Sequence, residues 1–285
     1  MLCAARSIEH EEYARSRNKG ASFGNKAPTT IAKREKQMKI QVLFALSSVL
    51  AGVLSGAGIC TVYAQGGQVR EIGLAQTGES SDTRVKTSIS VNTIHITEPG
   101  NYRLNANLSS AHAVIQIESS DVTLDLNGFN IASAGPGIVG AGDNIAILNG
   151  SIRPGDGVAV GLRGSNCRIE QLRVGGGRFG FDIRAEGDEG TGCLVKNNTV
   201  NAASLGISCI GCVLSGNTVT ANFQAIRASN ASLVLGNRVT GGQVALTLDD
   251  TTGYAENVLR GGQIDVTGGV QIGENLCVTN KFCAP

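Results

Sequence analysis

The chain has 285 residues, of which 39 are glycine, about twice the average share, while 4% are aromatic and none is tryptophan. A hydrophobic content of 41% is too high for a disordered chain, and the absence of a Gly-X-Y period excludes collagen. The net charge of +1 gives no reason to expect electrostatic binding to nucleic acid or to an anionic membrane surface.

The first 64 residues are predicted to serve export rather than folding. Residues 1–37 are polar and basic, which indicates a disordered segment or a mis-assigned start, with translation beginning at Met38. Residues 38–64 have a basic start, an uncharged apolar core and a Val62-Tyr63-Ala64 cleavage site, so we interpret them as a signal peptide. The alternative is a membrane anchor, because the uncharged stretch is long enough to span a bilayer. Cleavage would give a secreted, periplasmic or cell-surface protein without a membrane span.

An apolar residue recurs through the rest of the chain at the end of similar segments, among them LDLNGFNI, AILNGSI and LSGNTV. The residues five and seven positions before each of these anchors are nearly all apolar or small. This alternation predicts a strand with one buried face, and its recurrence predicts that the strands stack. The anchors are Ile131, Ile152, Val174, Val200, Val219, Val239 and Leu259.

A second family of strands lies in the other half of each unit. A unit of this length has no room for a crossover helix, so equivalent strands are predicted to be parallel neighbours on the coils of a β-solenoid. These segments begin at Gly157, Gly180, Gly206, Gln224, Val244 and Gly269.

Asparagine occurs close to each anchor, and we interpret it as structural. Asparagine tolerates the left-handed conformation and can bond along a stacked ladder, and these residues repeat with the turns instead of converging on one point. They are Asn127, Asn149, Asn197, Asn198, Asn217, Asn237 and Asn257.

With PGNYRLNANL at 99–108, SSDVTLDLNGFNI at 119–131 and later GNTV turns, the chain resembles the right-handed parallel β-helix proteins of the pectin-lyase-like superfamily over residues 90–275. The resemblance implies an all-β, right-handed parallel β-helix of about seven or more coils. We expect it over residues 96–275, after an N-terminal cap or linker (65–95) and before a C-terminal disulfide tail (276–285). It implies no single activity, because one scaffold carries many functions.

The outward positions of the first strand family turn apolar along the chain. Leu194, Val213 and Leu233 would form an exposed strip, better explained as covered by the N-terminal segment, by a loop or by another subunit. The last of these alternatives would be a homo-oligomer through the strip. The full row, six residues before each anchor, reads Asp125, Ala146, Arg168, Leu194, Val213, Leu233 and Gly253.

A charged cluster lies near the end of one strand of the second family. The insertion AEGDEGTG brings Glu186, Asp188 and Glu189 near Asp182, Arg178 and Arg184. Asp182 and the three insertion acids could bind calcium, and with Arg184 they could bind or cleave a uronic-acid sugar. The alternative is a solvated loop, because no EF-hand spacing is present. The outward positions of this family read Ala159, Asp182, Ser208 and Arg227, with Gly161, Arg184 and Ile210 two residues further on.

Other catalytic patterns of the resembled enzymes are missing from the sequence. Residues 65–285 hold only His95 and His112, so an epimerase Asp-Pro-His motif and polygalacturonase motifs cannot be matched. The acid pair Asp249-Asp250, in LDDTTG, is interpreted as a turn.

Six cysteines follow the leader, and an exported protein can oxidise them. Cys167, Cys193 and Cys212 each lie seven residues before an anchor and should stack, at a spacing that a disulfide accepts. Cys209-Ile-Gly-Cys212 could be a redox or zinc motif, but we favour structural cysteines. The predicted pairs are Cys167 with Cys193, Cys209 with Cys212, and Cys277 with Cys283. A Cys193 to Cys212 bond, or free thiols in the core, are the alternatives.

The sequence therefore predicts an exported solenoid that binds carbohydrate or a surface without catalysis, or that serves as a structural or adhesive element. The alternative is a polysaccharide lyase or glycoside hydrolase acting on uronic-acid polymers through the charged cluster. No cofactor other than calcium is indicated, and polysaccharide is the expected partner.

Overall fold

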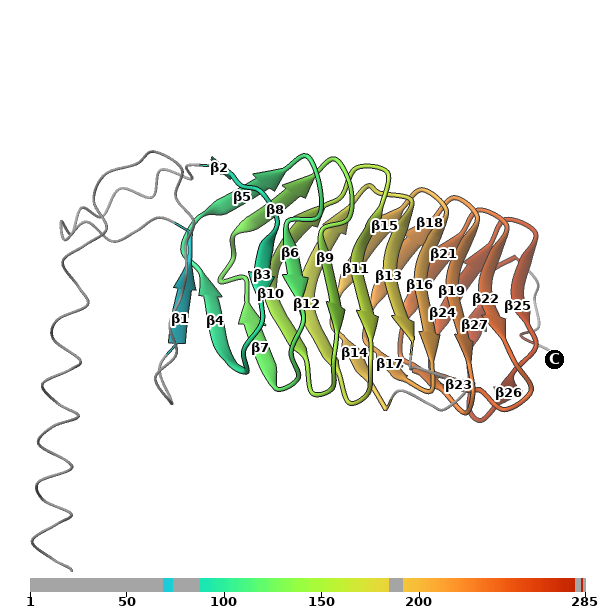
Figure 1. The fold of residues 1–285 in the computed structure, drawn as a ribbon. Coiled ribbons are helices and arrows are strands. Elements are labelled where there is room, and N and C mark those ends of the chain that lie inside the picture. Colours follow the sequence, from blue (N-terminus) through green and yellow to red (C-terminus); the bar gives the residue numbers. More distant parts are fainter. Residues whose placement is uncertain (1–68, 74–87, 185–191, 280–282, 284–285) are drawn as a thin grey trace, which may run out of the picture. The chain divides into compact units, whose positions relative to one another are not determined.

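The computed structural model describes residues 69–73, 88–184, 192–279 and 283, and within them it is a parallel β-solenoid of about 8 turns, with no helix (Figure 1). The all-β solenoid expected from the repeats is thereby confirmed. Each complete coil places strands on three faces, and all strand pairs are parallel. The segment at 38–64 that was predicted to be a signal peptide lies outside the described residues.

The first face carries the strands that begin each sequence repeat. Two of them, β10 and β12, are long enough to continue into the second face, which joins both faces into one 18-stranded sheet. The first face consists of β1 (Val69–Ile72), β4 (Gly100–Leu104), β7 (Val122–Asp125), β10 (Ala146–Arg153), β12 (Arg168–Gly175), β14 (Leu194–Lys196), β17 (Val213–Ser215), β20 (Leu233–Leu235), β23 (Gly253–Ala255) and β26 (Val270–Gln271).

The second face carries the seven anchor residues, which pair with one another from coil to coil and are all buried. The predicted register of the anchors is thus confirmed. Besides β10 and β12, the face consists of β2 (Ser88–Ser90), β5 (Asn107–Ser110), β8 (Asn130–Ser133), β15 (Thr199–Ala202), β18 (Thr218–Ala221), β21 (Arg238–Gly241), β24 (Val258–Gly261) and β27 (Leu276–Cys277).

One part of the predicted register is wrong. Counting back from the anchors aligned Leu124 with Ile145, whereas Leu124 pairs with Ile147. The turn between β7 and β8 holds Asn127 and Gly128, both at positive φ, and it is two residues longer than the corresponding step within β10. The same shift places Asp125 beside Leu148 instead of Ala146.

The third face is a separate nine-stranded sheet. It confirms five of the six segments predicted for the second strand family. The sixth, GVQIG from Gly269, is wrong: Val270 pairs with Gly253 on the first face, and Ile264–Thr267 takes the expected place. The face consists of β3 (Ile94–Ile96), β6 (Ile115–Ile117), β9 (Ile138–Ala141), β11 (Val158–Arg163), β13 (Phe179–Arg184), β16 (Leu205–Ile210), β19 (Gln224–Ser229), β22 (Val244–Leu248) and β25 (Ile264–Thr267).

Buried asparagines bond the later coils together, as the structural interpretation expected. Asn217 Nδ2 donates to Asn237 Oδ1 at 2.9 Å and to the Val195 carbonyl at 2.9 Å, while its own Oδ1 accepts from the backbone and side-chain amides of Asn198 at 3.0 Å. Asn198, Asn217, Asn237 and Asn257 are each 1% exposed. Asn127 and Asn197 instead occupy positive-φ positions between strands, and Asn149 has a positive φ within β10.

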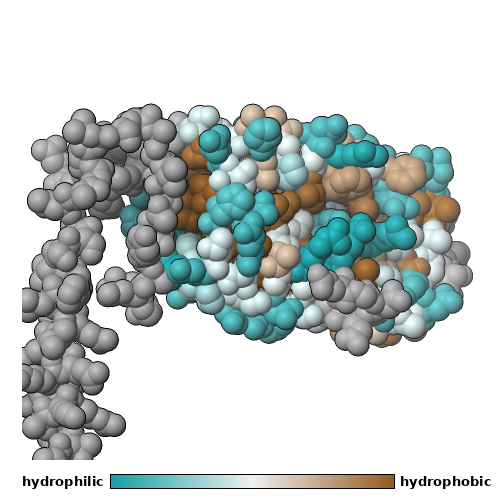
Figure 2. Space-filling model, viewed as in Figure 1, coloured by the Kyte–Doolittle hydropathy of each residue, from teal (hydrophilic) through white to brown (hydrophobic). Residues whose placement is uncertain are grey.

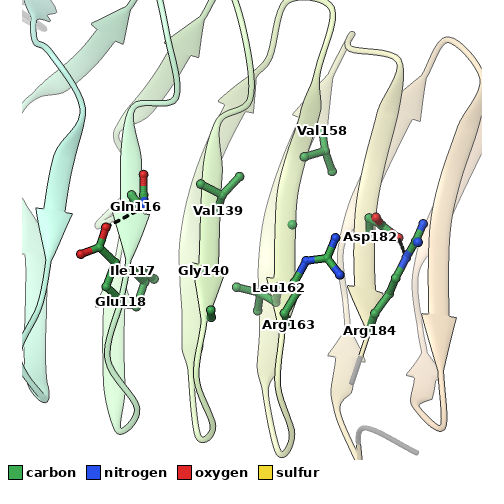
Figure 3. Close-up of a pocket in the computed structure, with 12 residues that line it drawn as sticks. Gln116, Ile117, Glu118, Val139, Gly140, Val158, Leu162, Arg163, Asp182 and Arg184 are labelled. Carbon is green, nitrogen blue, oxygen red and sulfur yellow. Dashed lines mark hydrogen bonds and ion pairs between the residues drawn. The ribbon is translucent and has the colours of Figure 1, made fainter. Parts of the chain in front are cut away.

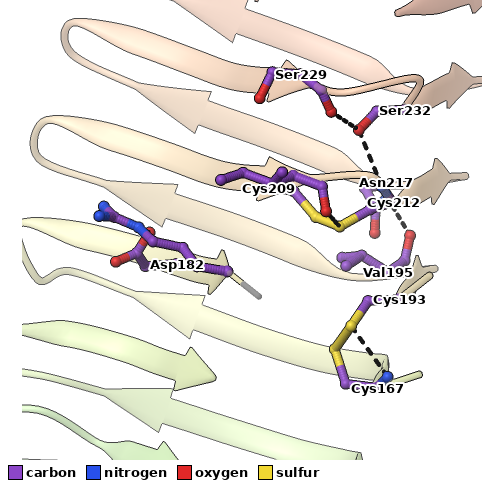
Figure 4. The surroundings of a disulfide bond; sticks show 11 residues. Cys167, Asp182, Cys193, Val195, Cys209, Cys212, Asn217, Ser229 and Ser232 are labelled. Atoms are coloured by element: carbon purple, nitrogen blue, oxygen red, sulfur yellow. Dashed lines mark hydrogen bonds and ion pairs between the residues drawn. A yellow bond between two sulfur atoms is a disulfide. The ribbon is translucent and has the colours of Figure 1, made fainter. Parts of the chain in front are cut away.

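The sulfur atoms of the three predicted cysteine pairs lie at disulfide distance. Figure 4 shows the pairs Cys167–Cys193 and Cys209–Cys212. The Cα atoms of Cys167 and Cys193 are 4.4 Å apart, because the two residues stack on neighbouring coils. Cys209 faces Cys212 across a tight turn, with Cα atoms 6.1 Å apart. Cys193 is therefore directed to Cys167, and the alternative pairing with Cys212 is not the one adopted.

The C-terminal tail closes the last coil. Tyr254 is fully buried, and its hydroxyl donates a hydrogen bond to the Cys283 carbonyl at 3.2 Å. Burial raises the pKa of the Tyr254 hydroxyl. Asp265 is 1% exposed and accepts hydrogen bonds from the Gly261 amide at 2.6 Å and from the Thr279 amide at 2.9 Å. At the other end, parallel pairing already begins at β1, within the segment expected to be a cap or linker.

Candidate functional site

The outward row of the third face places a charged group above the middle coils. Asp182 lies between Gly161 on the preceding coil and Ser208 on the next, and Arg227 follows Ser208. The complete row reads His95, Gln116, Val139, Gly161, Asp182, Ser208, Arg227, Thr247 and Thr267. Figure 2 shows hydrophilic groups next to apolar ones on this face.

One of the predicted outward positions is wrong, and with it the alignment of the position that follows. Ala159 was expected beside Asp182, but it is fully buried, and Gly161 stands in that place. Strands β11 and β13 each bury two consecutive residues, as in Ala159-Val160, so simple alternation fails there. The correct register pairs Arg184 with Arg163, a candidate site residue that the sequence reasoning missed.

A shallow cavity of about 320 Å³ lies over β6, β9, β11 and β13 (Figure 3). Gly140 and Gly161 form part of its floor. Gly161 leaves the hollow open, because a side chain at this outward position would lie against Val139 and Val158. Val139 and Val158 give it an apolar wall, and the polar and charged residues that line it are Gln116, Glu118, Arg163, Asp182 and Arg184.

The two arginines of the cavity lie on adjacent coils, about 4.8 Å apart along the solenoid. Arg184 Nε lies 2.8 Å from Asp182 Oδ1, which orients its guanidinium, and half of the Arg184 side chain remains exposed. Arg163 is also exposed. Two exposed guanidinium groups in neighbouring positions suit a ligand that carries carboxylate or sulfate groups, because arginine recognises such groups through paired hydrogen bonds.

The carboxylates of the cavity are each held by a neighbour. Glu118 Oε1 accepts from Gln116 at 2.7 Å and lies 3.0 Å from His95 Nδ1. Asp182 is held by Arg184. Three inter-strand steps separate β6 from β13, about 14 Å at the backbone, which exceeds the 5 to 9.5 Å that separates the paired carboxyl groups of glycosidases.

The remaining predicted site residues, Glu186, Asp188 and Glu189, lie outside the described residues, so the structure assembles only Asp182 and Arg184 from the expected cluster. Arg178 lies with its guanidinium 5.2 Å from the centre of the Phe179 ring. Within the described ranges, no three histidine, cysteine or acidic side chains gather as metal ligands. In those same ranges no helix is long and apolar enough to cross a membrane.

Asp249 and Asp250 form the turn predicted for them. Asp249 accepts hydrogen bonds from the Asn230 amide at 2.7 Å and from the hydroxyls of Thr251 and Thr252 at 3.0 and 2.7 Å. Burial alone would raise the pKa of the Asp249 carboxyl, but these bonds outweigh it and hold the pKa below its usual value. The carboxylate thus links two coils.

Replacing Asp249 with alanine is expected to lower the free energy of unfolding by about 1–2 kcal/mol at neutral pH, because several donors lose their acceptor. Since the folded pKa is lowered, this stabilisation is complete above the unfolded pKa, about 3.9, and is lost as the pH falls through the folded value. Urea titrations from neutral to acid pH should show a shallower decline for Asp249→Asn than for the unchanged protein. Asp250→Ala, at the exposed neighbour, should change neither quantity, and equal effects at both positions would contradict this assignment.

Comparison of the chain with family models, curated proteins and solved structures gives no match.

Proposed function

We propose that the protein is an exported, non-catalytic solenoid that binds an acidic polysaccharide across the third face. The observation that carries the proposal is the pair Arg163 and Arg184, exposed on adjacent coils beside a hollow floored by Gly140 and Gly161. A sugar ring could place its apolar face against Val139 and Val158 while its acidic group meets the guanidinium groups. The cysteine pairs and the leader at 38–64 support export to an oxidising compartment.

The alternative is a polysaccharide lyase or hydrolase that resembles the catalytic pectin-lyase-like enzymes. The distance between Glu118 and Asp182 disfavours a hydrolase that uses this pair. Calcium-assisted chemistry would need Glu186, Asp188 and Glu189 in addition to Asp182. We therefore favour binding over catalysis. Substitution of Asp182 distinguishes the two functions, because it should affect a binding protein and an enzyme differently.

Exchanging Arg163 and Arg184 together for alanine should weaken binding of a uronic-acid polymer about tenfold or more, since two charge-assisted contacts are lost. Affinity electrophoresis or calorimetry against polygalacturonate and alginate, with a neutral glucan for comparison, measures the effect. Arg238→Ala removes an exposed arginine from the second face and should leave binding unchanged. Equal loss with Arg238→Ala would show a diffuse charge effect and contradict the site.

Asp182→Ala distinguishes binding from catalysis. In a binding protein this change releases Arg184 from its ion pair, so affinity for the acidic polymer should stay equal or rise. In an enzyme that uses Asp182, the release of reducing ends or unsaturated products should disappear. Turnover by the unchanged protein that Asp182→Ala abolishes would overturn the non-catalytic proposal.

A further inference from the structure

The first face becomes apolar over its last five coils. The row that begins with Leu194 continues through Val213, Leu233 and Gly253 to Val270, in continuous register. Val213, Leu233 and Val270 are 36%, 37% and 47% exposed, although a soluble surface gains nothing from aligned aliphatic side chains. We call this row, together with the neighbouring Leu235, Ala255 and Ile272, the apolar strip.

The strip has little capacity for hydrogen bonding. Its side chains stand on five strands, β14, β17, β20, β23 and β26, which span about 19 Å along the solenoid. Over β14, β17 and β20 the outward residues form two rows, one from Leu194 to Leu233 and one from Lys196 to Leu235. Ser215 carries the one hydroxyl group among these side chains. Such a surface suits another apolar sheet face, because two sheets pack at about 10 Å with interdigitated side chains, and it does not suit a hydroxyl-rich sugar chain.

Opposite charges mark the two ends of the strip on one border. Lys196 is the last residue of β14, the strand that carries Leu194 and begins the strip. Glu256 and Glu274 are exposed beyond Ala255 and Ile272 on the last two coils, and the Glu256 amide bonds the Glu274 carbonyl at 2.6 Å. One end of this border is therefore basic and the other acidic.

We propose that two copies of the chain associate through the apolar strip, with their solenoids antiparallel. The two-fold axis runs parallel to the strands at the level of Leu233, the middle coil. This rotation reverses the order of the coils but brings the same border of the two strips together. Lys196 of one copy therefore meets Glu274 of the other, with Glu256 one coil away. A parallel arrangement, with the two-fold axis along the solenoid, exchanges the two borders and would set Lys196 against the other side of the partner's strip, away from Glu256 and Glu274. Only the antiparallel arrangement therefore pairs these opposite charges.

The dimer also leaves the third face of each copy open. The strip lies on β14 to β26 of the first face, whereas the cavity lies on β6 to β13 of a different sheet. Two polysaccharide sites would then act together on one polymer, which raises the overall affinity through multivalency. The inference does not rest on the proposed function, because dimerisation is measured without a ligand.

Sedimentation velocity of the purified full chain, over low to high micromolar concentrations, should show a monomer–dimer equilibrium. Leu233→Arg places two arginines at the two-fold axis and should raise the dissociation constant at least about tenfold. Phe223→Arg alters a side chain of similar exposure, 44%, beside β19 and should leave the equilibrium unchanged. Circular dichroism and the melting temperature establish that each variant remains folded.

Exchanging the charges at the border tests whether the two solenoids are antiparallel. Lys196→Glu and Glu274→Lys should each weaken self-association about three- to tenfold, and an equimolar mixture of the two variants should restore it, because both contacts then pair opposite charges. A monomer at every concentration, a dimer that is indifferent to Leu233→Arg, or a mixture no tighter than its components would overturn the proposal. Binding of the monomer to phospholipid vesicles, lost in Leu233→Arg, would also overturn it and assign the strip to a membrane surface.

Discussion

Replacing Asn217 with alanine should lower the free energy of unfolding by roughly 3 kcal/mol or more, because each buried group left without its partner costs about 1–3 kcal/mol. The side chain of Asn217 serves the Val195 carbonyl and both amides of Asn198 and also donates to Asn237. Alanine satisfies none of these groups, and at 1% exposure water has no access to replace the amide. The damage falls in the centre of the stack, so neighbouring coils should lose cooperativity as well.

Urea unfolding followed by circular dichroism measures the loss, and Asn201→Ala is the matched control. Asn201 lies on the same face, but its side chain is exposed, so its replacement should change stability by about 0.5 kcal/mol at most. A loss as small at Asn217 as at Asn201 would mean that the buried amides contribute little net stability.

The coil register could be predicted from the sequence because a single physical requirement repeats. Anchors such as Val200 and Val219 must be buried in every coil, and stacked parallel strands keep them aligned, so the spacing of apolar residues reports the fold directly. Where the turn length changes, as at Asn127-Gly128, the apolar pattern stays intact while the pairing shifts by two residues. Sequence patterns alone do not separate the two cases.

The candidate site was harder to predict, since its key residue lies outside the pattern that found the fold. Arg163 ends a strand that buries Ala159 and Val160 in succession, so counting by alternation from Gly157 placed the wrong side chains outward. Pairing of GVAVGL with GFDIRA by their Ala159 and Gly180 positions would have aligned Arg163 with Arg184. The small size of Ala159 and Gly180 was the feature of the sequence that could have indicated this alignment.

The same small positions lead to a second large effect: Gly180→Ala should lower the free energy of unfolding by about 2–3 kcal/mol, the usual cost of overpacking a core. A Cβ atom at Gly180 would lie 2.2 Å from the Gly206 carbonyl oxygen and 2.4 Å from Val200 Cγ1. The first contact is with backbone of the neighbouring coil, so β13 and β16 must separate to admit one methyl group.

Gly175→Ala is the control for this change, because Gly175 is exposed in β12 and an added Cβ would have no neighbour within 4 Å. Thermal unfolding should show a lower melting temperature for Gly180→Ala and almost none of that shift for Gly175→Ala. Because Asp182 and Arg184 follow Gly180 on the same strand, the Gly180 variant should also bind acidic polymer less tightly at temperatures where it remains folded. If Gly180→Ala were as stable as the unchanged protein, β13 could not lie as close to Gly206 and Val200 as the structure places it, and the packing of β13 against the next coil would have to be revised.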